Sequence, residues 1–258
     1  MYLWRKPATP RWLSDNESKL RVRAGDQLAI VEQPNRKRLQ VEVASKSRAE
    51  LQGLANEFGG GIEKLPRDWL KRFSRHKTKP IKVGGRSLII PAGTAFGTGD
   101  HATTSMSLRL LEKLTHKWNS GWSIVDLGTG SGILALAATH FGAKQVIGID
   151  KDPVAIATAT ENARLNEIGD VQFLIGDVRR WKCSRQIDIV TANVLSELLI
   201  KILPQLKAAR WMILSGILRN QERDVTRAAR QHKIDIVQVR RRGKWVAILT
   251  RSGRFGDP

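Results

Sequence analysis

Strands and helices alternate from Trp122 to the C-terminus, and this alternation constrains the fold more than any other feature. Apolar, β-branched runs predict strands, and the stretches between them have helical periodicity. The predicted strands are Ser123–Leu127, Gln145–Ile149, Val171–Ile175, Ile187–Ala192 and Trp211–Leu214. Such alternation is typical of a mostly parallel sheet with helices on both faces. The fold class is therefore α/β, a doubly wound, mostly parallel seven-stranded sheet.

The last part of the chain has a different pattern. Two β-prone runs in "KIDIVQVRRRGKWVAILTRS" are joined by a turn around Arg242 and Gly243. Runs joined in this way predict an antiparallel hairpin. We therefore expect the seven-stranded sheet to end in that hairpin.

A simpler pattern precedes the alternating region. Residues 28–31 and "LQVEVA" read as two strands joined by a polar turn, and a helix follows to Phe58. The run Gly59–Gly61 predicts a hinge. We divide the chain into a small basic α+β module at 1–60, a basic linker helix and strand at 61–90, and the main domain at 91–258.

The stretch Pro66–Gly85 is dense in positive charge, with Trp69 and Phe73 four residues apart. It is either an amphipathic helix that packs its aromatic side chains on the main domain or a nucleic-acid contact. A strand is expected at residues 87–90. Helical spacing in "TTSMSLRLLEKL" then predicts a helix capped by Thr103 or Thr104.

The formal net charge of +20 is the strongest compositional feature. The first 90 residues carry 20 Lys and Arg against 9 Asp and Glu. Such charge favours a phosphate-rich or acidic partner, although a solvated basic surface gives the same composition. No segment resembles a membrane span or a secretory signal, so a cytoplasmic location without membrane contact is expected. Cys183 is the only cysteine and the histidines are scattered, so no metal site is predicted.

Two Gly-Thr-Gly loops occur about thirty residues apart, in "TAFGTGDHATT" and "VDLGTGSG". The second lies between a strand and a helix, where ligands of open α/β sheets bind. It lacks the lysine of a phosphate-binding loop, and its sixth position is Ile133 where a dinucleotide loop has glycine. What remains is a ligand with an adenosine and no pyrophosphate, or a tight turn without any ligand.

Two aspartates follow the next two strands. Asp150 lies at the distance from Gly128 at which an acid accepts ribose hydroxyls in such folds. Asp177 either reaches an adenine amine or is an exposed loop residue.

Five motifs together carry a resemblance to a known family. They are "AFGTGDHATT", "VDLGTGSGILALAA", "VIGIDKDPVAI", "TANVL" and "LSGIL". From about Leu65 to Arg251 the chain resembles the ribosomal protein L11 methyltransferase (PrmA) family of class I methyltransferases. The first motif is the most specific of the five.

The resemblance implies a cofactor, S-adenosyl-L-methionine, with contacts at Thr104, Gly128, Asp150 and Asn193. It also implies that the second loop, with Gly128 and Gly130, carries the amino-acid part of the cofactor. The first loop would then be a lid that presents Thr104 and Phe96 beside the methionyl group. Family members have a longer N-terminal βαββαβ domain, whereas the stretch before Leu65 predicts little more than strand, strand, helix.

Methyl transfer requires an amine lone pair aligned with the sulfonium methyl group. Asn193, at the end of the fourth strand, is the expected catalytic residue, because its side-chain carbonyl can accept hydrogen bonds from an amine. The alternative is that Asn193 only caps the turn before the helix "SELLIKIL". His101 is either a catalytic base or, as favoured here, a hydrogen-bonding strut.

The expected function is methylation of lysine or N-terminal amino groups of a ribosomal protein of the large subunit. Ribosomal RNA is a further expected partner, through the basic N-terminal region. The alternatives are methylation of another protein, methylation of a nucleic-acid base amine, and a non-catalytic RNA-binding assembly factor. Against a base substrate, "NVLS" has no aromatic residue on which a flipped base could stack.

Overall fold

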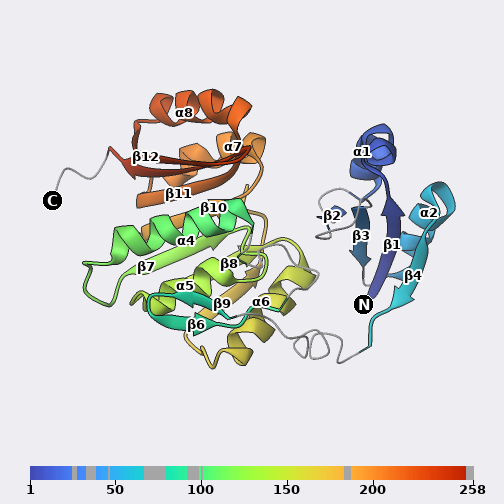
Figure 1. The fold of residues 1–258 in the computed structure, drawn as a ribbon, viewed down its shortest axis with the longest axis horizontal. Coiled ribbons are helices and arrows are strands. Elements are labelled where there is room, and N and C mark those ends of the chain that lie inside the picture. The colour runs from blue at the N-terminus through green and yellow to red at the C-terminus, as the bar shows by residue number, and fades with distance from the viewer. Residues whose placement is uncertain are drawn as a thin grey trace. The chain divides into compact units, whose positions relative to one another are not determined.

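The structure is a computed structural model that describes residues 1–24, 28–32, 39–45, 47–66, 80–91, 99, 101–182 and 187–253. The chain forms two compact units, Met1–Arg72 and Phe73–Pro258. Figure 1 shows the helices and strands of each unit. Each unit is described by itself.

The N-terminal unit has the order βαββαβ. Its elements are β1 (Tyr2–Ala8), α1 (Pro10–Ala24), β2 (Leu28–Glu32), β3 (Leu39–Ser45), α2 (Arg48–Phe58) and β4 (Gly61–Lys64). The four strands form an antiparallel sheet in the order β2-β3-β1-β4. One core joins the sheet to both helices, with Trp4 and Val43 from the strands, Leu20 from α1 and Leu54 from α2.

The prediction of only strand, strand, helix before Leu65 is therefore wrong, because β1, α1 and β4 were missed. The hinge expected at Gly59–Gly61 is wrong as well, since Gly61 already pairs with Arg5 across β4 and β1. Gly59 and Gly60 connect α2 to β4 and lie against β1: a Cβ on Gly60, whose φ is +94°, would lie 2.5 Å from the Arg5 carbonyl oxygen. The indole nitrogen of Trp4 donates to the Gly59 carbonyl at 2.9 Å.

The second unit begins, among the described residues, with a small hairpin of β5 (Ile81–Val83) and β6 (Arg86–Leu88). Its turn residues Gly84 and Gly85 have φ of +56° and +76°, which only glycine adopts readily at both positions. The strand expected at 87–90 thus begins at Arg86 and ends at Leu88. The basic segment Pro66–Gly85 was predicted as a possible helix, but residues 81–83 within it form a strand. Trp69 and Phe73 of that segment lie outside the described residues.

The main sheet has seven strands in the order β12-β13-β11-β10-β7-β8-β9. The strands are β7 (Ser123–Leu127), β8 (Gln145–Asp150), β9 (Val171–Ile175), β10 (Ile187–Asn193), β11 (Ala209–Leu218), β12 (Ile234–Arg242) and β13 (Trp245–Ser252). The first five run parallel to one another, β13 pairs antiparallel with β11, and β12 pairs antiparallel with β13. The expected doubly wound sheet with a terminal hairpin is confirmed.

Helices cover both faces of this sheet (Figure 1). They are α4 (Ala102–Thr115), α5 (Ile133–His140), α6 (Pro153–Leu165), α7 (Ser196–Leu206) and α8 (Glu222–Gln231), with a 3-10 turn at Arg219–Gln221. Along β11, Met212 packs in the core with α7 and α8, and the next residue, Ile213, packs in the core with α4 and α5. Successive strand residues point to opposite faces, so these helix pairs lie on opposite sides. Within the described ranges, no helix is long and apolar enough to cross a membrane.

Candidate functional site

The second glycine loop lies at the point where the strand order reverses, because β7 pairs with β8 on one side and with β10 on the other. Gly128, Gly130 and Gly132 have φ of +72°, +54° and +81°, a backbone region that favours glycine. The amides of Gly128 and Thr129 both donate to the Ile149 carbonyl, at 2.8 and 3.0 Å. The loop is thereby fixed against the end of β8.

Asp150, the last residue of β8, is half-buried beside this loop. One carboxylate oxygen accepts from the Gly130 amide at 3.0 Å and the other from the Asp152 amide at 3.1 Å. Burial raises the pKa of Asp150, and these backbone hydrogen bonds oppose the rise. A carboxylate has about four acceptor positions. Both oxygens of Asp150 can therefore accept further hydrogen bonds from a ligand.

Asp126 is a buried acid below the loop that sequence reasoning missed. Its side chain is 1% exposed and accepts from the Thr191 hydroxyl at 2.6 Å and the Thr129 hydroxyl at 2.7 Å. Burial raises its pKa to about 6, the two hydroxyls lower it, and the charge of Asp150 raises it. The signal was an aspartate inside the otherwise apolar strand "SIVDL", since an acid in such a strand must find hydrogen-bond donors.

Asn193 ends β10 beside Ser215 of the parallel strand β11. It does not cap α7, because the residue that caps α7 is Leu195 and no side chain makes a capping hydrogen bond there. The alternative interpretation of Asn193 as a cap is therefore wrong.

Val194, the next residue, lies between two glycines. A Cβ on Gly128 would lie 2.5 Å from a Val194 side-chain methyl, and a Cβ on Gly216 would overlap the Val194 carbonyl oxygen. Gly216 has a φ of +84° and belongs to a bulge in β11. The glycine loop and the turn after Asn193 therefore pack directly against one another.

Helix α4 brings Thr104 to the same strand ends. The Ser215 hydroxyl donates to the Thr103 carbonyl at 3.4 Å, so the first turn of α4 touches the residue beside Asn193. Thr104 is 1% exposed, and within the described part of the chain its buried hydroxyl has no hydrogen-bond partner. A hydroxyl in this state is available to a ligand.

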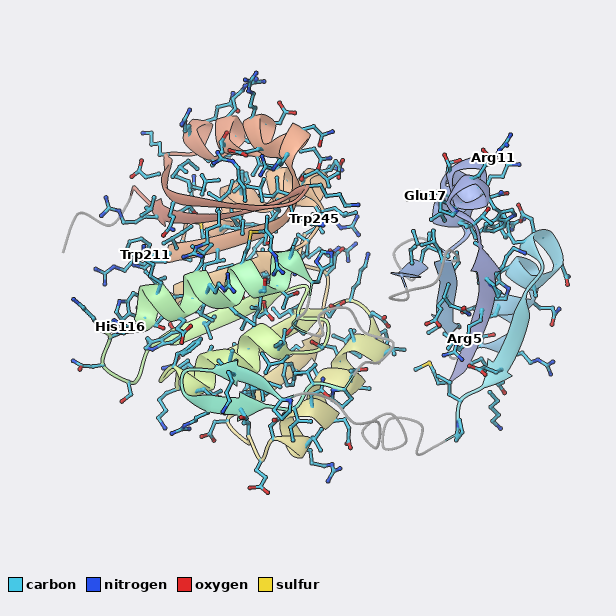
Figure 2. The ribbon with its side chains drawn as sticks, viewed as in Figure 1. Arg5, Arg11, Glu17, His116, Trp211 and Trp245 are labelled. Atoms are coloured by element: carbon cyan, nitrogen blue, oxygen red, sulfur yellow. The ribbon has the colours of Figure 1, made fainter. Side chains whose placement is uncertain are left out.

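The cap of α4 is His101, and the prediction of Thr103 or Thr104 is wrong. The ring Nδ1 of His101 accepts from the Thr103 amide at 3.4 Å and lies 2.7 Å from the Thr103 hydroxyl. The ring also packs edge-on against Trp245 at 5.1 Å between centroids (Trp245 is labelled in Figure 2). This geometry agrees with the strut that the sequence favoured.

The first glycine loop is described only in part, and Phe96 lies outside the described residues. Gly99 is described: it has a φ of +90°, and a Cβ there would lie 3.2 Å from a side-chain methyl of Ile133. Ile133 is the first residue of α5, directly after the second loop. The two Gly-Thr-Gly loops therefore approach each other.

Asp177 differs from the other expected residues. Its carboxylate makes a two-pronged ion pair with Arg179, with contacts of 2.7 to 3.0 Å. This pairing lowers its pKa to about 2. The structure thus brings together the ends of β7, β8 and β10 with α4, whereas Asp177 is already occupied by a neighbouring cation.

The comparisons with known proteins agree with this geometry. The family model described as "Ribosomal protein L11 methyltransferase (PrmA)" matches residues 74–253. A protein of that name from Heliobacterium modesticaldum is 37% identical over 194 residues, which cover 67% of this chain and 60% of that protein. Another from Clostridium perfringens is 33% identical over 205 residues, covering 71% and 64%. This chain therefore spans about three fifths of the length of these relatives.

Solved structures show the same relationship. The crystal structure of a ribosomal protein L11 methylase from Lactobacillus delbrueckii subsp. bulgaricus matches with a TM-score of 0.60 and 30% identity, over 69% of this chain and 91% of that one. Magnesium protoporphyrin IX methyltransferase from Synechocystis PCC 6803 with bound SAM matches with a TM-score of 0.50 and 18% identity, over 58% and 79%, which shows the fold alone. Since the family model matches well over half of the residues, the chain belongs to the ribosomal protein L11 methyltransferase (PrmA) family.

Proposed function

We propose that this chain is an S-adenosylmethionine-dependent methyltransferase that acts on amino groups, of lysine side chains or an N-terminus, of a ribosomal protein of the large subunit. The observation that carries the proposal is the meeting of the glycine loop, Asp150 and Asn193 at the strand ends where the sheet order reverses. The names of the relatives support the choice of substrate.

The residues at this site fit a nucleoside linked to an amino acid. The missing side chain of Gly128 makes room for Val194, and the side-chain-free backbone at Gly130 allows close approach of the ligand. The Asp150 carboxylate has acceptor positions left for two ribose hydroxyls, and the buried Thr104 hydroxyl lacks a partner within the described residues. Phe96 completes the proposed set as part of the lid. Asp177 belongs to the proposed set as a contact of the adenine amine, and it would make that contact while its carboxylate stays paired with Arg179.

S-adenosylmethionine supplies, when bound, an electrophilic methyl group on a sulfonium. The work left to the protein is alignment and orientation of the attacking nitrogen. Asn193 is the proposed catalytic residue, because its amide oxygen can accept a hydrogen bond from the substrate amine. This hydrogen bond would orient the nitrogen lone pair toward the sulfonium methyl group. The packing of Val194 between Gly128 and Gly216 holds that turn in place.

The domain roles and location are proposals too. We assign the N-terminal unit, Met1–Arg72, to substrate or ribosome docking and the second unit, Phe73–Pro258, to methyl transfer. A contact with ribosomal RNA through the N-terminal region is supported by its excess of Lys and Arg. A cytoplasmic location fits the single cysteine.

The test is transfer of a tritiated methyl group from S-adenosylmethionine to a ribosomal extract, followed by mass spectrometry of the labelled protein. We expect label on amines of a ribosomal protein. Asn193→Ala should lower kcat by a larger factor than it raises the cofactor Kd, and the exposed Asn119→Ala should change neither. Label found on RNA, or an Asn193→Ala variant with normal turnover, would contradict the proposal.

A further inference from the structure

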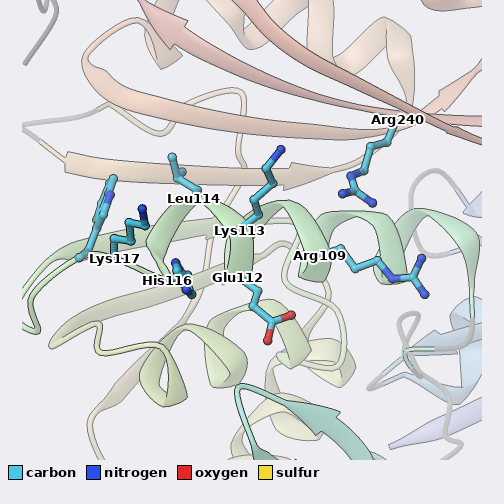
Figure 3. Close-up of a pocket in the computed structure, with 8 residues that line it drawn as sticks. Arg109, Glu112, Lys113, Leu114, His116, Lys117 and Arg240 are labelled. Atoms are coloured by element: carbon cyan, nitrogen blue, oxygen red, sulfur yellow. The ribbon is translucent and has the colours of Figure 1, made fainter.

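A basic hollow lies along α4 (Figure 3), which packs on the face of the sheet opposite α7 and α8. We define it by Arg109, Lys113 and Lys117, which follow α4 and the turn after it, and by Arg240 of the edge strand β12. Arg109, Lys113 and Lys117 are each four residues apart, and this spacing puts successive side chains on one face of a helix.

The facing strand is aligned with this row of charges. Arg240 pairs across the hairpin with Ala247, which packs in the core that contains α4, so Arg240 points to the α4 side. Lys113 reaches Gln238, two residues earlier on β12, with 3.2 Å from its ammonium nitrogen to the amide oxygen. Positive charge is thus presented from two elements that meet along one line.

Few of these charges are neutralised. The lining has one acid, Glu112, which extends away from Arg240 in Figure 3. Among the described residues, no ion pair involves any of the four cations, and the buried Nε of Arg240 has no hydrogen-bond partner. By contrast, Arg241 points to the other face and is paired with Glu222 at 2.5 Å. Of these two neighbouring arginines on β12, the one that has no ion pair among the described residues is therefore the one that faces the hollow.

The row of charge continues to the candidate site. Arg242, next but one to Arg240 on β12, donates to the Ser105 hydroxyl at 2.9 Å. Ser105 follows Thr104 in the first turns of α4. A ligand bound along the hollow would therefore end near the first turn of α4, which contacts Ser215 beside Asn193.

We propose that this hollow binds the phosphate backbone of RNA. The nine residues from Arg109 to Lys117 span about 12 Å at a rise of 1.5 Å per residue, a length over which a nucleic-acid strand presents several phosphates. Arginine and lysine are the side chains that most often donate hydrogen bonds to phosphate oxygens. At the end of the hollow, the half-buried Trp118 adds an apolar ring beside these charges. This surface consists of residues of the second unit and shares none with the basic N-terminal region, and the inference does not depend on the proposed methylation.

The test compares two triple variants of the full chain that lose the same charges. The hollow variant is Arg109→Gln, Lys113→Gln and Lys117→Gln. The control is Arg230→Gln, Lys144→Gln and Lys201→Gln, which changes exposed residues of α8, the α5–β8 connection and α7. Binding of a fluorescein-labelled RNA hairpin is followed by anisotropy over a series of KCl concentrations.

We expect the hollow variant to bind RNA about tenfold more weakly than wild type. The slope of log Kd against log salt concentration should fall by about 2 to 3, since three phosphate contacts disappear. The control should stay within about twofold of wild type, as expected of charges that contact no phosphate. Equal weakening in both variants would show that only the overall charge attracts RNA. No weakening in the hollow variant would also overturn the proposal, as would tighter, hollow-dependent binding of polyglutamate or anionic vesicles.

A second measurement keeps the proposal testable if the triple variant folds poorly, as judged by circular dichroism. Photo-crosslinking of the RNA hairpin to the wild-type chain should label peptides that contain residues 109–118 or 240–245. Crosslinks confined to other parts of the chain would contradict the proposal. Methylation of a free protein substrate should be unchanged in the hollow variant, so failure here and failure of the proposed function are distinguishable.

Discussion

Asp150 connects the glycine loop to the proposed nucleoside site, because its two carboxylate oxygens hold the Gly130 and Asp152 amides. Removing this carboxylate takes away charged hydrogen bonds to the ribose hydroxyls. We expect Asp150→Ala to weaken cofactor binding by about 1 to 3 kcal/mol, or about 5- to 150-fold in Kd. Isothermal titration with S-adenosylmethionine measures this.

The control for that titration is Asp170→Ala, which removes an exposed carboxylate at the opposite end of the neighbouring strand β9. Its Kd should match wild type. An Asp150→Ala variant that binds the cofactor with wild-type affinity would remove Asp150 from the proposed site.

Asp126 makes the stability of the fold depend on pH. Its native pKa of about 6 lies above the ordinary 3.8, so the native state holds this proton more tightly than the unfolded state. Protonation of Asp126 therefore contributes stability that is fully present below pH 4 and is lost as the pH rises through about 6. The shift corresponds to about 3 kcal/mol.

Asp126→Asn stays neutral and escapes this loss. Relative to wild type, its free energy of unfolding should therefore improve by up to about 3 kcal/mol between about pH 4 and pH 7. Urea titrations at both pH values measure the difference, and Asp170→Asn is the exposed control. A difference that does not change with pH would mean that Asp126 titrates alike in both states.

Some of these residues follow from sequence and others do not. Gly128 and Asp150 are predictable because their spacing in a strand-loop-helix-strand unit fixes their place at the strand ends. The partners of Asp126 are not, because Thr191 comes from a strand 65 residues away and only the fold brings the two together. Asp177 and Arg179 are only two residues apart, but the sequence does not show that they form an ion pair, because the partner of an aspartate depends on how exposed its side chain is in the fold.

At the scale of elements, the bulge in β11 supports the turn that carries Asn193. Gly216 has a φ of +84°, and a Cβ there would overlap the carbonyl oxygen of Val194. We expect Gly216→Ala to displace this turn, to cost about 1 to 3 kcal/mol of stability, and to reduce turnover.

Gly53→Ala in α2 is the matched control, because nothing lies within 4 Å of its added Cβ and a helical alanine is favoured by about 0.5 to 1 kcal/mol. Thermal melting and kcat are measured for both variants. If Gly216→Ala had wild-type turnover, the bulge would not position Asn193.

The N-terminal elements show why sequence patterns can fail. In β1, "YLWRKPA", charged residues and Pro7 obscure the alternation, and both Leu3 and Trp4 are buried. Helix α1 is mostly polar, and β4 has only four residues, of which Ile62 is the sole large apolar one. These elements depend on pairing with β3 and β1 and on the shared core, which local patterns do not reveal. The strands of the main sheet were predictable because each carries its own run of apolar, β-branched residues.

At the scale of the whole molecule, the two compact units have separate hydrophobic cores. We expect two unfolding transitions in scanning calorimetry. S-adenosylmethionine at about 100 times its Kd should stabilise the second unit alone by about 2.7 kcal/mol, which raises its Tm by about 5 to 11 °C. A single transition, or an equal shift of both, would show that the units unfold together.

The central claim is that one nucleoside-amino acid ligand binds at the reversal of strand order, with its reactive end toward Asn193. A crystal structure of the chain with S-adenosylmethionine tests it most directly. We predict ribose hydroxyls on the Asp150 carboxylate, the amino-acid part over Gly128 and Gly130, and the methyl group facing Asn193. A ligand bound elsewhere, or held with its methyl group turned away from Asn193, would contradict the account.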